Sequence, residues 1–147
     1  MTKRSKAREV ALQLLYQHDY NPPEKRSRID TFVRDRLRGV GLQGFCFSLY
    51  DGTIEHLQEI DKRITEAAEN WRLERMPAVD RNVLRLGGYE LLFSEDTPAP
   101  VAFDEAIELA KRFGSKDSPG FVNGVLDKLR RSAQVSETAT PSESDAS

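Results

Sequence analysis

The stretch Pro77-Ala-Val-Asp-Arg-Asn-Val-Leu-Arg-Leu-Gly-Gly-Tyr-Glu-Leu-Leu-Phe-Ser94 decides the fold class of this chain. Pro77 suits the first turn of a helix, where its missing N–H is not needed. Apolar side chains then recur at helical spacing, at Val79, Val83, Leu84, Leu86, Leu91 and Leu92. Gly87-Gly88 costs about 1 kcal/mol per glycine relative to alanine in mid-helix. The stretch therefore predicts a helix over 77–94 that another helix approaches closely at the two glycines.

The chain after this stretch predicts two more helices. Thr97-Pro98-Ala99-Pro100 is a linker, and residues 101–113 carry an apolar stripe that includes Phe103 and Phe113. Gly114 is a natural C-terminal cap, and Ser118 with Pro119 starts the last helix. Residues 133–147 are polar, with no apolar stripe to bury, and predict a disordered acidic tail.

The chain before residue 77 is also helical in its spacing. Residues 5–20 predict one helix, which Asn21-Pro22-Pro23 ends, and Ser27 is expected to cap a second. A third runs from about Phe45 to Asn70, with Asp51-Gly52 as a kink rather than a hairpin turn. No segment alternates with period two for long enough to form a sheet. The fold class is therefore all-α, a compact bundle of six or seven helices over residues 1–132.

Composition excludes several classes of protein. The 147 residues fit one domain, and 22 basic against 24 acidic side chains give a net charge of −2. Cys46 is the only cysteine, which excludes an intramolecular disulfide framework and a multi-cysteine zinc site. No apolar run reaches about 18 residues, so we expect no membrane span. The N-terminus lacks the pattern of a signal peptide, and we expect a cytoplasmic protein.

Candidate catalytic and metal-binding residues do not combine into a site. Gly39-Val-Gly-Leu-Gln-Gly44 matches a dinucleotide-binding pattern, but no strand precedes it, so we interpret it as an interhelical loop. Cys46 lies between two phenylalanines, a setting that makes a thiol inert. His18 and His56 have no metal-ligand spacing with it. We therefore expect no enzyme, no metal and no cofactor.

Charge is unevenly distributed along the chain. Lys3, Arg4, Lys6 and Arg8 are interrupted by no acid, and residues 25–38 hold six more basic side chains against two acidic ones. Residues 133–147 carry Glu137, Glu143 and Asp145 and no base. Such asymmetry favours a polyanionic partner, and a basic arm of this kind is typical of proteins that hold single-stranded nucleic acid. An arm that is merely solvated is the equal alternative from charge alone.

Four blocks, taken together and in this order, resemble the NusB family of bacterial transcription antitermination factors. They are residues 6–16 (KAREVALQLLY), residues 83–86 (VLRL) with 89–91 (YEL), residues 105–111 (EAIELAK) and residues 121–127 (FVNGVLD). The resemblance spans about residues 3–131. It implies an all-helical fold of two halves and a role without catalysis. It further implies pairing with the ribosomal protein NusE, binding of single-stranded boxA in ribosomal RNA leader transcripts, and entry into a complex on RNA polymerase that suppresses termination.

The resemblance also assigns residues to these roles. The arginine-rich arm of the family aligns with Lys3, Arg4, Lys6 and Arg8, and a second RNA-contacting region aligns with Phe113, Lys116, Asp117 and Phe121. The phenylalanines would offer faces to bases and Asp117 would accept a hydrogen bond from a base edge, with core packing as the alternative for both rings. The NusE-facing surface aligns with Tyr16, Glu74 and Asp80, an acidic patch that would suit a basic partner.

The chain departs from the family pattern at several positions. Ser5 stands where many members have another base, and Phe103-Asp104 stands where Ile-Asn is usual, which removes two hydrogen-bond donors. Asn123 and Gly124 match, and we expect them to shape helix packing rather than contact RNA. The acidic tail has no general counterpart. Its charge motivates the hypothesis that it docks on the basic arm and weakens nonspecific RNA binding.

Two other functions remain in view. A NusB-like domain also forms the N-terminal RNA-binding part of ribosomal RNA cytosine methyltransferases, so this chain could be a stand-alone module of that kind. The blander alternative is a helical scaffold with a solvated basic face, which predicts weak RNA binding without sequence preference. The resemblance also allows a homodimer, because NusB-like proteins can self-associate through surfaces that overlap the RNA and partner sites.

Overall fold

The computed structural model describes residues 2–23, 25–69 and 71–146, with side chains described to residue 134. Those residues form seven α-helices and one 3-10 turn with no strand among them, so the all-α prediction is confirmed. The elements are α1 (Lys3–Tyr20), α2 (Arg26–Arg36), α3 (Val40–Glu55), α4 (Leu57–Ala67), η1 (Leu73–Arg75), α5 (Ala78–Leu92), α6 (Ala99–Phe113) and α7 (Ser118–Ala146).

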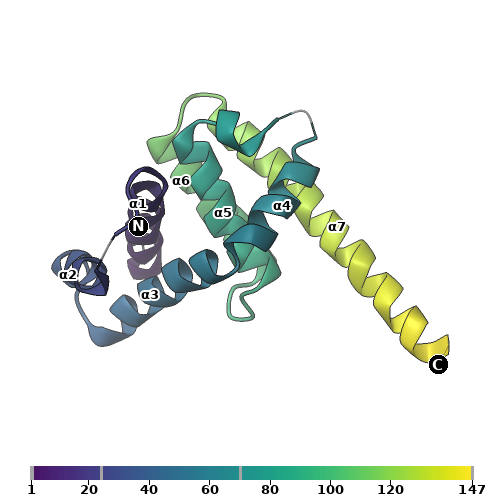
Figure 1. Ribbon diagram of the computed structural model, residues 1–147, viewed down its shortest axis with the longest axis horizontal. Coiled ribbons are helices and arrows are strands. Elements are labelled where there is room, and N and C mark those ends of the chain that lie inside the picture. The colour runs from purple at the N-terminus through teal and green to yellow at the C-terminus, as the bar shows by residue number, and fades with distance from the viewer. Residues whose placement is uncertain (1, 24, 70, 147) are drawn as a thin grey trace.

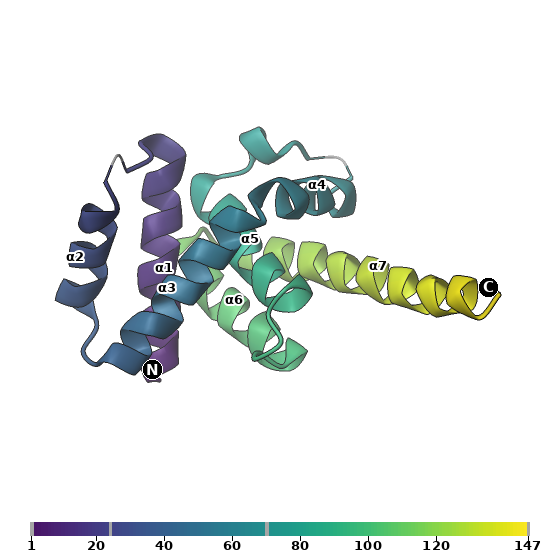
Figure 2. The ribbon, with the colours of Figure 1, turned by 60° about the horizontal axis from the view of Figure 1, so that its bottom comes forward.

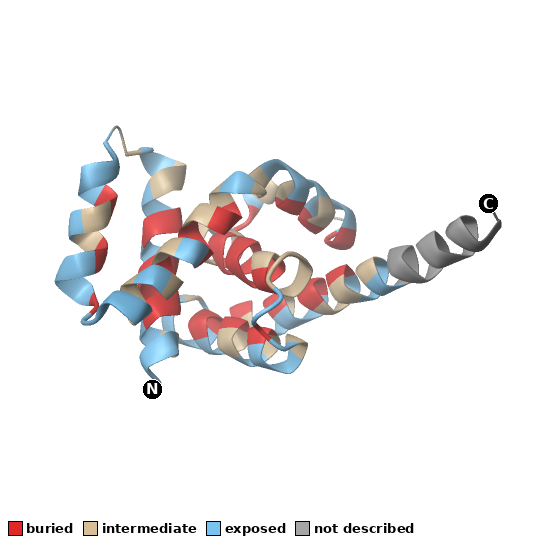
Figure 3. Cartoon of the chain, turned by 90° about the horizontal axis from the view of Figure 1, so that it is seen from below, coloured by how far each residue is buried: buried red, intermediate tan, exposed pale blue. Residues whose placement is uncertain are grey.

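The helices form two halves around α5. Helices α1–α3 lie on one side of the molecule and α4–α7 on the other, while the far end of α7 projects from the body (Figure 1). Helix α5, which is the stretch of residues 77–94 that carried the fold prediction, packs against α1, α3, α4, α6 and α7. Each of these helices contributes buried residues, red in Figure 3, to a single core cluster. One continuous apolar core therefore joins the halves.

The close approach predicted at Gly87-Gly88 is confirmed at Gly87. A Cβ placed on Gly87 would lie 3.2 Å from Leu126 Cδ1 and 3.3 Å from Ala106 Cβ. At Gly88 the nearest atom, on Ile60, would be 3.5 Å away, which is ordinary contact. Helices α6 and α7 therefore pack against α5 at a distance that only glycine permits without rearrangement.

The prediction of one long helix from Phe45 to Asn70 is wrong. The chain forms α3 and α4 instead, and the break falls at His56 rather than at Asp51-Gly52. The His56 ring stacks on Phe93 with 4.1 Å between ring centroids. Gly52 lies inside α3, where a Cβ would collide with the ring of Tyr89. The glycine thus reflects close packing against α5, and the stacked histidine accompanies the change of direction.

Three expected helix starts also differ in the structure. Helix α1 begins at Lys3, where Thr2 Oγ1 accepts a hydrogen bond of 3.0 Å from the Ser5 N–H, so the basic arm is helical rather than flexible. Ser27 lies inside α2, whose N-cap is Lys25. Gly39 is the N-cap of α3 with a φ of 94°, and the glycine pattern therefore starts a helix instead of forming a loop.

A polar network ties α1 to α4 and α5. Arg85, 8% exposed, donates to both Asp19 and Asp61 at 2.6–3.0 Å. The Asp19 carboxylate also accepts hydrogen bonds from Arg81 at 2.9 Å and from Asn82 at 2.8 Å. Because several hydrogen bonds converge on partly buried Asp19, this network fixes how α1 sits on the second half.

Helix α7 extends beyond the buried core. Its last buried residue is Leu129, and no residue from Arg130 to Gln134 is buried. The helix is described to Ala146, and the side chains from residue 135 onward lie outside the described residues. The domain end at residue 132 and the disorder of the tail stay predictions, and the exposure of residues 130–134 agrees with a core that ends there.

Candidate RNA and protein interface

Three cations of the N-terminal arm are exposed on the first turns of α1. Lys3, Arg4 and Lys6 all face solvent, and no acidic side chain occupies the first turn. The Arg4 guanidinium lies 4.4 Å from the centroid of the Phe45 ring on α3, which places it across the gap between the two helices. Positive side chains at a helix N-terminus oppose the helix dipole. Without a bound anion, this arrangement therefore destabilises the start of α1. It suits an anion that binds there.

Arg8 differs from the other three. It is 3% exposed, and its guanidinium donates hydrogen bonds of 2.8 and 3.0 Å to the Glu90 carboxylate on α5. A second carboxylate, that of Glu105, lies 3.6 Å away and accepts a 2.7 Å hydrogen bond from Ser5 Oγ. Arg8 and Ser5 thus hold α1 against α5 and α6. A phosphate contact by Arg8 would require the buried pair to open.

The structure divides the second predicted RNA region. Lys116 and Asp117 are exposed in the turn before α7, and Phe121 is half-buried one turn further along. The Phe121 ring meets the Trp71 ring edge-on, with centroids 6.1 Å apart and an angle of 71°. Phe113, 38% exposed, ends α6 just before this turn and also lines a groove beside α1. Phe113 is therefore the one residue of the four that lines this groove.

An ion-pair ladder connects the arm to that turn. Glu9 is 7% exposed and lies 3.7 Å from the Lys6 ammonium and 3.2 Å from the Arg112 guanidinium at the end of α6. Arg112 also lies over the Phe113 ring at 5.2 Å. Basic side chains therefore continue from the first turns of α1 across to the end of α6, next to the turn that carries Lys116 and Asp117.

The second basic cluster of the sequence is partly engaged within the fold. Arg26 pairs with Asp51 at 2.8 Å and with Asp30 at 3.2 Å. Arg36 lies 3.5 Å from the centroid of the Phe32 ring and donates to the Phe32 carbonyl. Arg34 and Arg38 are exposed near the start of α3, at the end of the molecule where α1 begins (Figure 2). The cluster does not act as one uniform patch.

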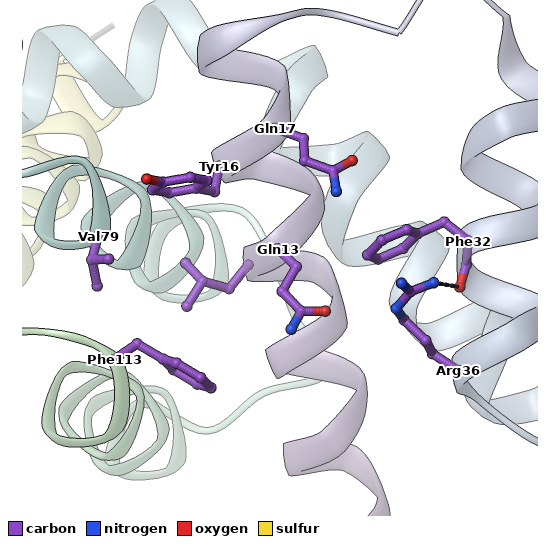
Figure 4. A pocket seen from close by; sticks show the side chains of 8 residues that line it. Gln13, Tyr16, Gln17, Phe32, Arg36, Val79 and Phe113 are labelled. Carbon is purple, nitrogen blue, oxygen red and sulfur yellow. Dashed lines mark hydrogen bonds between the residues drawn. The ribbon is translucent and has the colours of Figure 1, made fainter.

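A groove runs along α1 between α2 and α6. One part of it holds about 350 Å³, and Tyr16, Phe32, Val79 and Phe113 turn their side chains toward it from four helices (Figure 4). A neighbouring hollow of about 650 Å³ shares Tyr16 and Phe32 with it and continues toward Tyr20, whose ring centroid is 5.0 Å from that of Tyr16. The groove is therefore aromatic and exposed along two turns of α1.

The residues expected to face NusE do not form one acidic patch. Tyr16 lies in the groove and Glu74 is exposed on η1. Asp80, by contrast, is 5% exposed and accepts a 2.6 Å hydrogen bond from Ser118 Oγ at the start of α7. Among the described residues, the charged side chains that line the groove and its neighbouring hollow are Arg36 and Arg28. The groove thus offers aromatic contact rather than negative charge, and Asp80 anchors α7.

The remaining candidates for chemistry are structural. Cys46 is fully buried, as predicted, and burial raises the pKa of its thiol to about 12, which disfavours the reactive thiolate. His18 Nδ1 lies 3.5 Å from the Tyr50 hydroxyl. The described part of the chain contains no group of three His, Cys, Asp or Glu side chains able to hold a metal ion. None of its helices is both long and apolar enough to cross a membrane.

Sequence reasoning missed several surface residues. Trp71 was not among the expected functional residues, yet it is 55% exposed and contacts Phe121. Its signal was a lone tryptophan between polar residues. Phe32 and Val79 were assigned to buried helix faces, yet both line the groove. Asn123 and Gly124 were expected to shape helix packing, but both are exposed on α7.

Comparisons with known proteins agree on one family. The NusB family model matches residues 5–131. The transcription antitermination protein NusB of Solibacter usitatus is 48% identical over 135 residues, covering 89% of this chain and 90% of the relative. That of Trichlorobacter lovleyi is 43% identical over 129 residues, covering 88% and 91%.

Solved structures give the same result. The structure of T. maritima NusB has a TM-score of 0.78 and 38% identity, covering 88% of this chain and 92% of its own. A crystal structure of the antitermination factors NusB and NusE in complex with dsRNA gives a TM-score of 0.80 at 27% identity, with 90% and 98% covered. Fold and sequence therefore point to the same relatives.

Proposed function

This chain belongs to the NusB family, and from that premise we propose that it is a transcription antitermination factor that binds RNA together with NusE. A relative matched over 98% of its length was crystallised with NusE and RNA. The observation on this chain that carries the proposal is the exposed cluster of Lys3, Arg4 and Lys6 on the first turns of α1, with no acid in the first turn to offset it. The protein works without catalysis, in the cytoplasm, as part of a complex on RNA polymerase.

The RNA surface we propose begins at that cluster and continues to the start of α7. Lys3, Arg4 and Lys6 neutralise phosphates, and the ladder through Glu9 and Arg112 leads toward Lys116. Asp117 accepts hydrogen bonds from an exposed base edge, and the half-buried Phe121 ring offers a face for stacking. The ligand is single-stranded boxA, because stacking and edge contacts of this kind need unpaired bases. Arg8 supports the arm from within and contributes no phosphate contact in this arrangement.

The aromatic groove beside Tyr16 is the NusE site in this proposal. It adjoins the RNA surface at Phe113, whose ring lies 5.2 Å from the Arg112 guanidinium. Tyr16 and Phe113 lie on opposite walls, and Val79 adds an apolar side chain between them. Aromatic side chains in a partly exposed groove are typical of the centre of protein interfaces. Phe113 therefore acts with Tyr16 toward NusE, while Glu74 lies outside the groove.

The related methyltransferase module is less well supported. Curated relatives that match over about 90% of their own lengths are named antitermination proteins.

A homodimer through the same groove would compete with NusE, and the titration described next separates the two. A solvated scaffold would bind boxA and scrambled RNA equally.

The test is a fluorescence anisotropy titration of labelled boxA RNA and a scrambled control. With Lys3, Arg4, Lys6 and Lys116 on about four phosphates, log affinity falls against log salt with a slope of about −3. The double variant Lys3→Gln/Arg4→Gln should reduce that slope to about −1.5, while Lys62→Gln/Arg63→Gln on α4, with the same change in charge, leaves it unaltered.

NusE provides the second arm of the same titration. Added NusE should sharpen the preference for boxA over the scrambled RNA, and Tyr16→Ala should remove that gain without changing the affinity measured in the absence of NusE. Equal affinity for the two RNAs, unaffected by NusE, would contradict the proposed function and favour the scaffold.

A further inference from the structure

Trp71 stands out on the surface of the second half. It is the only tryptophan of the chain and is 55% exposed, although a ring of this size usually buries most of its apolar area. Its backbone is held just after α4, where its N–H donates a 3.0 Å hydrogen bond to the Ala68 carbonyl. Glu69, two residues earlier, has a φ of 34°, which turns the chain sharply out of the helix. The backbone hydrogen bond therefore places Trp71 just after the end of α4.

The indole forms one wall of a hollow against α7. The hollow holds about 280 Å³, and the Phe121 ring, edge-on at 6.1 Å, closes the wall at one end. Gly120 and Gly124, one turn apart on α7, form the opposite side, and Lys128 follows one turn later. A Cβ on either glycine would meet no atom of the described residues within 4 Å. The space beside these glycines is thus open to solvent.

Among the described residues, no neighbour requires a glycine at position 120 or 124. Each costs α7 about 1 kcal/mol relative to alanine, because glycine loses more backbone freedom on folding. At Gly87 a close helix contact explains that cost, but at Gly120 and Gly124 no such contact exists among the described residues. Their effect is to leave a flat strip of backbone opposite an exposed indole. A flat ligand fits between two such surfaces better than a branched side chain does.

Two charged side chains line the hollow, the basic Lys128 and the acidic Glu69. Lys128 pairs with Glu69 at 3.8 Å, and both side chains are more than half exposed, so the pair is worth little and yields readily to a phosphate. The hollow also adjoins Phe121, the stacking ring of the RNA surface proposed above. We propose that the space between Trp71 and the Gly120–Gly124 strip is a stacking subsite for one unpaired RNA base, with Lys128 on its phosphate.

This inference rests on the proposed function, and the indole itself reports on it. Base–aromatic stacking tolerates any base and contributes about 1–3 kcal/mol. A stacked base also quenches tryptophan fluorescence emission. Because Trp71 is the only tryptophan of the chain, all of that emission comes from position 71. Titration of the full chain with boxA RNA should quench that emission, with the same midpoint as the anisotropy of labelled RNA.

The outcomes separate the two proposals. Binding by anisotropy with unchanged emission would overturn the stacking subsite while the proposed function stands. No binding by anisotropy would overturn both. Emission that changes with NusE alone, or with protein concentration alone, and not with RNA would identify the hollow as a protein interface and overturn the subsite.

Variants give a second measurement. Trp71→Leu should weaken RNA binding by about 5- to 100-fold, whereas Trp71→Phe retains most of the affinity. Gly124→Leu fills the hollow from the other side and should weaken binding similarly, while its urea midpoint stays at or above that of the parent. Asn123→Leu, exposed on the neighbouring stripe of α7 and outside the hollow, is the matched control and should bind RNA as the parent does. Equal affinity of Gly124→Leu and Asn123→Leu would overturn the subsite.

Discussion

Arg4 and Arg8 show how two identical side chains, one helical turn apart, take different roles. Arg4 is exposed and rests over Phe45, whereas Arg8 is 3% exposed and shares two hydrogen bonds with Glu90. The difference arises because α1 enters the body of the molecule between these residues. The acidic partner of Arg8 lies 82 positions away, so local sequence could not distinguish the two.

Replacing Arg8 and replacing Arg4 should therefore change stability by different amounts. Arg8→Ala leaves the Glu90 carboxylate buried and unpaired, and we expect it to lower the free energy of unfolding by about 3–5 kcal/mol. Arg4→Ala should change it by less than about 0.5 kcal/mol, because the side chain is exposed. Urea denaturation of both variants measures the two effects.

A double variant provides the control for that experiment. Arg8→Met/Glu90→Leu replaces the pair by apolar side chains of similar volume and should recover most of the lost stability. If Arg8→Ala were as stable as Arg4→Ala, the pair would not hold α1 to α5, and Arg8 would be available to RNA after all.

Single residues were predictable where one physical property decided the outcome. The burial of Cys46 followed from its two phenylalanine neighbours, and the close contact at Gly87 followed from the cost of glycine in a helix. Asp80 was not predictable, because its partner Ser118 lies 38 positions away and turns an apparent surface acid into an anchor for α7. Trp71 was missed for the same reason, since its neighbour Phe121 is remote in sequence.

At the scale of helices, existence was easier to predict than boundaries. The other expected helices are present, the one predicted from Phe45 to Asn70 forms two, and α7 begins at Ser118 as predicted. The break between α3 and α4 was misplaced because Asp51-Gly52 looks like a weak point in a helix. The stacking of His56 on Phe93 joins residues that are remote in sequence, so it could not be seen in the local pattern. Likewise, the start of α1 at Lys3 has a local cause, the Thr2 cap, that sequence reasoning overlooked.

The contact of α1 with α4 and α5 depends on an ionised Asp19. Partial burial disfavours its charge, but hydrogen bonds from Arg85, Asn82 and Arg81 outweigh this and hold its pKa below the usual range. A carboxyl with a lowered folded-state pKa contributes its stability fully above the unfolded value, about 3.9, and loses it as pH falls through the folded value. The attachment of α1 should therefore weaken in acid.

We expect Asp19→Asn to be less stable than the parent at pH 7 and to approach it in stability as pH falls from 4 toward 2. Urea denaturation at several pH values measures the gap. Asp35→Asn, at an exposed position on α2, is the matched control and should show almost no gap at any of these pH values. A gap for Asp19→Asn that is constant between pH 7 and pH 2 would contradict the assignment of the charge to this network.

On the scale of the whole molecule, α1 separates two surfaces. Its first turns carry the exposed cations, and its later turns carry Tyr16 in the aromatic groove. Because α5 packs against both halves, each surface keeps a fixed position relative to the other. Family resemblance was enough to predict that both surfaces exist. The residues that form each surface were not predictable from sequence, because Phe113 lines the groove and Arg8 and Asp80 are buried.

The tail adds a charge effect that acts on the molecule as a whole. Residues 133–147 carry Glu137, Glu143 and Asp145 with no base, whereas the exposed arm is uniformly positive. An acidic segment tethered to the same chain competes with weakly bound RNA for such cations at a high effective concentration. Deletion of residues 133–147 should therefore raise affinity for unrelated RNA at low salt and have little effect at high salt, where the attraction is screened.

The deletion should leave folding intact, because Leu129 is the last buried residue of α7 among the side chains described to residue 134. An unchanged urea midpoint would show this, and anisotropy with scrambled RNA at two salt concentrations would measure the affinity. A full-length variant with Glu137, Glu143 and Asp145 all changed to Gln separates charge from length. If it behaves like the deletion, charge is responsible. If neither variant changes affinity at low salt, the tail does not act on the arm, and RNA selectivity resides wholly in the helical domain.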